Sequence, residues 1–147
     1  MVFEPIMEMD KAWRALNEDL IEDIKNNNWG FYRNTQYDMA EHLRKDNKLL
    51  DSLHHLLLVA YLDLNGPQNL NGPQMFKEHP PFDGNLDNYP IPPTIIKHIL
   101  SAQKKLELNE SELSKIFLSV AKKNKISIMP VSPKFALQKL LDQINTL

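Results

Sequence analysis

Two groups of acidic and imidazole side chains have the spacing of a metal site built on helices. Asp38 and His42 are four residues apart, and Asp51 precedes His54 by three residues and His55 by four. Residues three or four apart share one face of a helix. Helical bundles hold metal ions with carboxylate and imidazole pairs on facing helices. These five residues are therefore the candidate metal ligands of the chain.

Whether the two groups meet depends on Asp46-Asn47, which lies between them. A turn there makes residues 35–64 a helical hairpin, and the two groups can then approach each other. One continuous helix instead separates them by roughly 18 Å at 1.5 Å per residue, too far to share an ion. The simpler interpretation is an Asp–His hydrogen bond along one helix. The chain lacks Glu-x-x-His and His-Glu-x-x-His, and we expect no cofactor.

Other chemistry finds little support in the residues. There is no cysteine, which excludes disulfides, thiolate metal sites and cysteine nucleophiles. There is no Gly-x-Ser-x-Gly, and no Gly-x-Gly or Gly-Lys-Ser/Thr to cradle a phosphate. We therefore predict a small helical interaction or regulatory module without catalytic activity. The alternative is a helical metal-binding protein or metalloenzyme that uses the Asp/His pairs.

A charge asymmetry between the two parts of the chain suggests DNA binding as a third function. Residues 1–93 carry 15 acidic and 8 basic side chains, whereas residues 94–147 carry 4 acidic side chains and 9 lysines. Residues 106–117 also have the hydrophobic spacing of a helix–turn–helix. However, Glu107 stands where such turns favour glycine, and Glu110 and Glu112 would face phosphates. We expect an ordinary helical hairpin there and no nucleic-acid partner.

The elements that must position these residues follow from apolar spacing. Residues 5–26 form a helix with a seam every three or four residues: Ile6, Met9, Trp13, Leu16, Leu20 and Ile24. The same periodicity exposes the acids of this helix, Glu18, Asp19, Glu22 and Asp23. Residues 29–32 are interpreted as an aromatic connector, and Thr35 as the N-cap of a short second helix.

The third helix, residues 49–64, is apolar on two sides. Its main seam is joined by a second strip of Leu58, Val59 and Leu62, so we expect it at the centre of the bundle or at a subunit interface. A long Pro/Asn/Gly-rich loop at about residues 65–93 follows, with Leu-Asn-Gly-Pro-Gln at both 64–68 and 70–74. Loops of this length in compact domains are usually functional or disordered.

Three helices complete the chain. Pro92-Pro93 opens the first, Asn109 with Glu112 caps the second, and Ser132-Pro133 starts the third, whose inward residues are predicted to begin with Phe135. Residues 126–131 are predicted to be extended.

The whole chain is predicted to be one all-α domain, residues 1–147, folded as an irregular bundle of five to six helices. No signal sequence or membrane span is evident, so we expect a cytoplasmic protein that does not enter a membrane. The expected partner is a protein or a second copy of the chain. A homodimer is favoured, built on the 49–64 helix or on the surface that the first helix leaves open.

Overall fold

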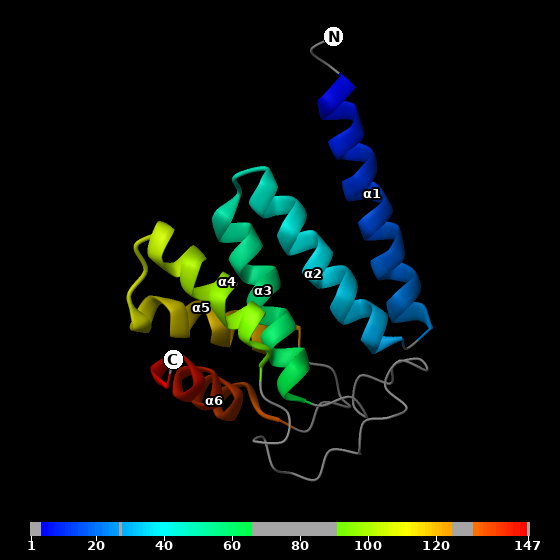
Figure 1. Cartoon of the computed structure of the whole chain (residues 1–147). Coiled ribbons are helices and arrows are strands. Elements are labelled where there is room, and N and C mark those ends of the chain that lie inside the picture. The colour runs from blue at the N-terminus through cyan, green and yellow to red at the C-terminus, as the bar shows by residue number, and fades with distance from the viewer. Residues whose placement is uncertain (1–3, 27, 66–90, 125–130, 147) are drawn as a thin grey trace.

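Six helices make up the part of the chain that the computed structural model describes, residues 4–26, 28–65, 91–124 and 131–146. They are α1 (Glu4–Lys25), α2 (Trp29–Lys45), α3 (Leu49–Leu64), α4 (Pro93–Lys105), α5 (Glu110–Lys123) and α6 (Pro133–Asn145) (Figure 1). No strand occurs in these ranges, and the predicted all-α bundle is confirmed. Most of the predicted 65–93 loop, and the predicted extended segment up to residue 130, lie outside the described residues.

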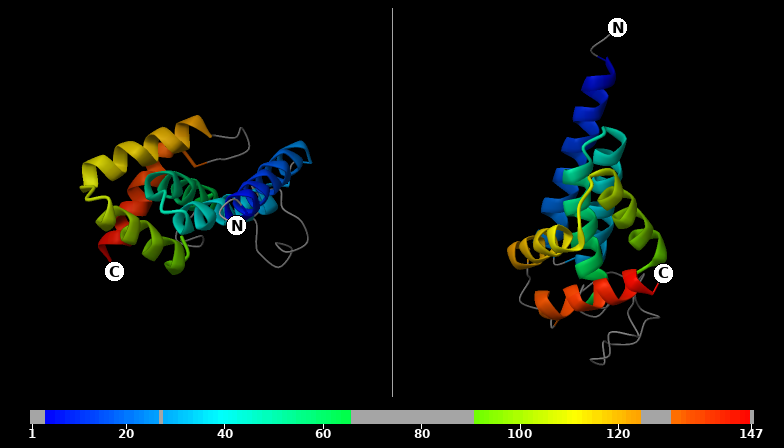
Figure 2. Two further views of the ribbon diagram at one scale, coloured as in Figure 1. Left: turned by 90° about the horizontal axis from the view of Figure 1, so that it is seen from above. Right: turned by 90° about the vertical axis from the view of Figure 1, so that its left-hand side faces the viewer.

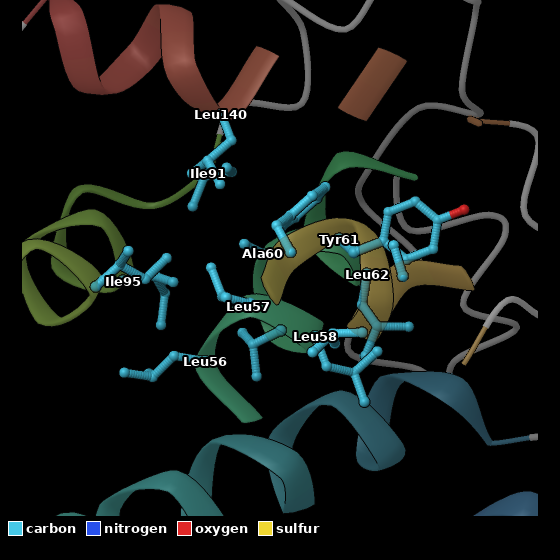
Figure 3. Close-up of a cluster of buried hydrophobic side chains, with 14 of the residues drawn as sticks. Leu56, Leu57, Leu58, Ala60, Tyr61, Leu62, Ile91, Ile95 and Leu140 are labelled. Carbon is cyan, nitrogen blue, oxygen red and sulfur yellow. The ribbon is translucent and has the colours of Figure 1, made fainter. Parts of the chain in front are cut away.

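α3 occupies the centre of the bundle, because α2, α4, α5 and α6 all pack against it. Figure 3 shows Leu57 among Ile91, Ile95 and Leu140 from the later part of the chain. Both apolar sides of α3 are buried: Leu53, Leu56, Leu57, Ala60 and Leu64 on the main seam, and Leu58, Val59 and Leu62 on the second strip. The second strip is therefore covered within one chain and is not available to a second copy.

The same type of tight turn joins α2 to α3 and α4 to α5. Asn47 and Glu107 each adopt the left-handed region, with φ of 59° and 55°. In the first turn the N–H of Lys48 donates to the carbonyl of Leu43 at 2.8 Å, and the second turn has the equivalent bond. This bond is the mark of a Schellman helix end. Residues 35–64 therefore form a hairpin and not one rod.

α2 begins earlier than the sequence suggests. The side chain of Asn28 accepts a hydrogen bond from the backbone N–H of Phe31 and so caps the helix at residue 28. Residues 29–32 are therefore its first turn, and their interpretation as a connector is wrong. Thr35, predicted as the N-cap, lies inside α2. The side chain of Asn28 supplies the acceptor that the free N–H groups at a helix start need. The helix therefore begins after Asn28, seven residues before Thr35.

α1 lies at the edge of the molecule and packs mainly against α2 (Figures 1 and 2). Two predictions for this helix are wrong. Asp23 is buried, and its Oδ2 accepts a hydrogen bond from the Thr35 hydroxyl at 2.9 Å. Ile24 is 46% exposed, although its spacing places it in the seam. Because α1 has its main neighbour on one side, that neighbour buries a narrower face of the helix than the apolar spacing predicts.

The predicted starts of the later helices are confirmed. Asn109 and Glu112 form a reciprocal capping box, and the Ser132 side chain accepts from the N–H of Phe135. Phe135 itself is 64% exposed, which corrects its predicted inward position, because Ala136 and Leu140 form the buried side of α6.

Polar bonds tie the segments that precede α4 and α6 to the core. The amide of Gln143 binds both backbone groups of Ile91, with its Oε1 accepting at 2.9 Å and its Nε2 donating at 3.1 Å. The Tyr61 hydroxyl donates to the carbonyl of Val131 at 2.7 Å, and Asn65 accepts from the Val131 N–H at 3.0 Å. These buried backbone groups therefore have the partners that burial requires.

Candidate functional site

The α2–α3 hairpin does not bring the predicted ligands into one cluster. Within the described ranges, no three His, Asp or Glu side chains are grouped so that they could hold a metal ion. Asp38 lies in a groove between α1 and α2, Asp51 is exposed on α3, and the imidazoles of His54 and His55 line a pocket beside α5.

An indole from α1 packs against two of these imidazoles. The ring of Trp13 stacks on that of His42, with centroids 5.6 Å apart and planes inclined by 27°. It meets His55 edge-on, with centroids 6.2 Å apart. Aromatic rings in these arrangements stabilise each other beyond the area that they bury. Trp13 thus makes His42 and His55 part of the packing between α1 and the hairpin.

His55 has a second fixed neighbour in Gln36 on α2. Its Nδ1 lies in hydrogen-bond contact with Oε1 of Gln36, which assigns the proton of the neutral ring to Nδ1 and leaves Nε2 as the acceptor. Burial lowers the pKa of His55, and the neighbouring His54 lowers it further, while Asp51 acts in the opposite direction. The ring is therefore neutral at pH 7 unless a negative group approaches it.

A pocket of about 210 Å³ opens between α2, α3 and α5. Its lining is mostly polar: Gln36, His54, His55, Leu58, Ser119, Val120, Lys123 and Asn124. The sequence identified the two histidines but not Lys123, because a lysine in the last turn of a helix is sufficiently explained by the helix dipole. Only the packing of α5 on α3 shows that this ammonium group and the imidazoles share one pocket.

A second hollow, the acidic groove, lies between α1 and α2 and has a volume of about 320 Å³. It is lined by Asp19, Glu22, Asp23, Phe31, Asn34, Thr35 and Asp38. Burial raises the pKa of Asp38, and the negative charges of Asp19 and Glu41 raise it further. Burial also raises the pKa of Asp23, against the hydrogen bond from Thr35. The predicted ligand Asp38 thus faces other carboxylates and not the imidazole of His42.

The outer flank of α1 exposes two large apolar side chains. Ile21 is 64% exposed and Ile24 is 46% exposed. They are neighbours on the helix surface, because they are three residues apart. Sequence reasoning missed this pair, since it assigned Ile24 to the buried seam and gave Ile21 no role.

The α4–α5 turn places acidic side chains where a DNA-binding motif needs neutral or basic ones. Glu107, Glu110 and Glu112 are all exposed, and the last two occupy the first turn of α5. Glu107 adopts the left-handed conformation at the position where the turns of DNA-binding motifs favour glycine. The geometry adds nothing in favour of nucleic-acid binding.

Comparisons with known proteins give no guide to function. A scan against models of protein families, a search of curated proteins and a search of solved structures found no match to the chain. Among the described helices, none has both the length and the apolar character that a membrane crossing requires.

Proposed function

We propose that the protein is a small helical interaction module without catalytic activity, and that it binds a second copy of itself through the outer flank of α1. The exposure of Ile21 and Ile24 carries the proposal. These two side chains lie on α1, which packs mainly against one helix, α2. Adjacent exposed apolar residues with a polar surround are typical of interaction surfaces.

The two isoleucines lie at the C-terminal end of a regular stripe on α1. Spacings of three and four residues relate the members of this stripe: Arg14, Asn17, Ile21 and Ile24. Such spacing is that of a helix seam that pairs with another helix. Isoleucines next to polar residues resemble the apolar centre of a small interface and part of its polar rim. Polar residues in a seam also favour one register over others.

The charges beside the stripe suit a second copy in the antiparallel orientation. Glu18 precedes Ile21 by three residues, and Lys25 follows it by four. Both side chains are exposed. An antiparallel pairing about Ile21 therefore brings Glu18 of each copy close to Lys25 of the other, and the two-fold axis produces the pair twice. Such rim charges contribute mainly to orientation and specificity.

One helix flank from each copy makes a small interface. Interfaces below about 1,200 Å² belong to the weak and transient class. The expected dimer is therefore reversible, with dissociation in the micromolar range or weaker. Dimer formation that depends on protein concentration suits a regulatory module better than a permanent assembly does.

Sedimentation velocity over a concentration series tests the proposal. The mass is expected to rise from 17.1 kDa towards twice that value as concentration increases. Ile21→Asp places a charge at the centre of the interface and is expected to keep the protein monomeric. The matched control is Leu50→Asp, because Leu50 is also exposed (45%) but belongs to α3 and not to α1. That variant is expected to dimerise like the wild type.

A charge exchange tests the antiparallel register. Glu18→Lys and Lys25→Glu are each expected to weaken the dimer, and the double variant is expected to restore it, because the attraction is re-formed with the signs reversed. A wild-type mass of 17.1 kDa at every concentration would refute self-association. Equal loss in Ile21→Asp and Leu50→Asp would show that the flank of α1 is not the interface.

A further inference from the structure

The pocket between α3 and α5 gathers basic groups without an acidic one. Of the described residues that line it, three can carry a positive charge, His54 and His55 from α3 and Lys123 from α5, and none is acidic. The acid that precedes them on α3, Asp51, is exposed and does not line the pocket. Such a concentration of positive charge stands out in a chain whose net charge is −2.

At the end of α5, the carbonyl of Val120 is occupied and does not oppose a negative ligand. Asn124 donates to the carbonyl of Val120 twice, from its backbone N–H at 3.1 Å and from its side-chain Nδ2 at 2.8 Å. Free carbonyls at a helix C-terminus would repel an anion. With this carbonyl occupied, the Lys123 ammonium and the Ser119 hydroxyl are the donors that α5 offers to the pocket.

The dimensions of the pocket restrict the ligand to a small one. Its volume of about 210 Å³ lies below the roughly 300–1,000 Å³ of sites for drug-sized molecules. The lining provides hydrogen-bond donors on two sides, because α3 and α5 contribute one set each. A compact ion with several acceptor oxygens fits both the size and the donors.

We propose that this pocket binds a small oxyanion of the phosphate class, held by His54, His55 and Lys123. The ammonium of Lys123 provides a positive charge, and the two imidazoles offer ring N–H groups as hydrogen-bond donors to the oxyanion. Gln36 already holds Nδ1 of His55, so the second ring nitrogen of His55 is the one available to the ligand.

Binding is coupled to proton uptake by the imidazole of His55. The pKa of His55 is lowered in the empty pocket, chiefly by burial, and a negative charge beside the ring opposes that effect. The charged groups around His55 are His54 and Asp51 on α3 and Lys123 on α5. Trp13 of α1 and Gln36 of α2 contact the ring but do not titrate. An anion is therefore bound more tightly as the pH falls.

Isothermal titration calorimetry with sulfate, inorganic phosphate and glycerol phosphate tests the site. Sulfate keeps two charges throughout, so a pH dependence of its binding reports on the protein. Binding of sulfate is expected to strengthen about ten-fold from about pH 8 to pH 6, as the imidazole of His55 gains a proton. Phosphate and its ester have the same terminal oxyanion, and tighter binding of the ester would identify an organic phosphate as the ligand.

Two neighbouring lysines provide a matched pair of variants. Lys123→Met is expected to weaken binding by about ten-fold or more, because a charge-assisted hydrogen bond is lost. Lys122→Met removes the same charge from an exposed lysine outside the pocket and is expected to bind as the wild type does. His54→Gln is expected to weaken binding, because the pocket loses one of its two imidazoles. His54, Lys122 and Lys123 are exposed, so these variants keep the fold, which circular dichroism verifies.

Two results would overturn the proposal. One is no binding heat and no shift of the His55 imidazole resonances at about 20 mM sulfate or phosphate and pH 6, since an anion held even at millimolar strength gives both. The other is an equal effect of Lys122→Met and Lys123→Met, which would indicate attraction to the surface charge in general. Neither result bears on dimerisation through α1.

Discussion

The guanidinium of Arg33 and the carboxylate of Asp63 form a two-bond ion pair that joins α2 to the last turn of α3. Nε of Arg33 donates to Oδ1 of Asp63 and Nη2 of Arg33 donates to Oδ2, each at 2.9 Å. The two side chains are only 19% and 13% exposed. Paired bonds of this kind fix the orientation of both groups. The pair therefore sets how the end of α3 sits against α2.

Removal of Arg33 is expected to destabilise the protein in a pH-dependent way. Arg33→Met leaves the Asp63 carboxylate without its partner, which typically costs about 3–5 kcal/mol at pH 7. Burial raises the pKa of Asp63, and Arg33 opposes that rise, so the pKa in the variant is higher still. The folded variant then binds the proton more tightly than the unfolded chain, and the loss of stability shrinks as the pH falls from about 7 towards 5.

Urea denaturation of wild type and Arg33→Met at several pH values measures this effect. Arg33→Met/Asp63→Leu is the companion variant, since it removes both charges and is expected to recover much of the loss. An equal difference between Arg33→Met and wild type at every pH would contradict the assignment of the cost to a buried charge on Asp63.

Trp13→Ala is expected to lower the free energy of unfolding by about 2 kcal/mol, less than the ~3–5 kcal/mol of a fully buried tryptophan, because the indole is half-buried. The loss comes from its contacts with His42 and His55. Denaturant midpoints followed by circular dichroism measure it. Lys11→Ala, on an exposed position of the same helix, is the control and is expected to leave the midpoint unchanged. An unchanged midpoint in Trp13→Ala as well would show that α1 is not held by its indole.

Glu107→Gly is expected to stabilise the protein by up to about 1 kcal/mol. Glu107 has a φ of 55°, which glycine adopts without the clash of a Cβ atom. The equivalent change Asn47→Gly is expected to give a smaller gain, because asparagine tolerates this conformation better than glutamate does. Thermal unfolding of both variants measures the difference. A destabilised Glu107→Gly would mean that its side chain makes a contact that outweighs the strain.

The sequence predicted most of the helices because their ends carry local signals. The Asn109–Glu112 box, the Ser132 cap and the apolar seam of residues 49–64 need no knowledge of the rest of the chain. The start of α2 was missed because local signals can be ambiguous. Both Asn28 and Thr35 are suitable N-cap residues, and only Asn28 caps the helix. Periodicity also reports which side of a helix is apolar and not how much of that side a neighbour covers, which accounts for the exposed Ile24 and Phe135.

The candidate pocket was only partly accessible to such reasoning. Sequence spacing singled out His54 and His55 but paired them with Asp51, since residues one turn apart are all that one helix reveals. Their observed polar neighbours, Gln36 and Lys123, are 19 and 68 residues distant in the chain from His55. These side chains meet because α2 and α5 pack against α3. The packing of the buried helix faces determines that arrangement.

The central place of α3 has a consequence for local opening. Four helices rest on it, so its amide hydrogens are freed only when those helices separate, and their exchange with solvent follows global unfolding. Because α1 packs mainly on α2, we expect it to detach while the rest stays folded, and its amides to exchange first. The molecule thus divides into a cooperative unit around α3 and an outer helix with an opening equilibrium of its own. A contact that holds α1 in place, such as a second α1, would slow exchange in that helix and leave α3 unaffected.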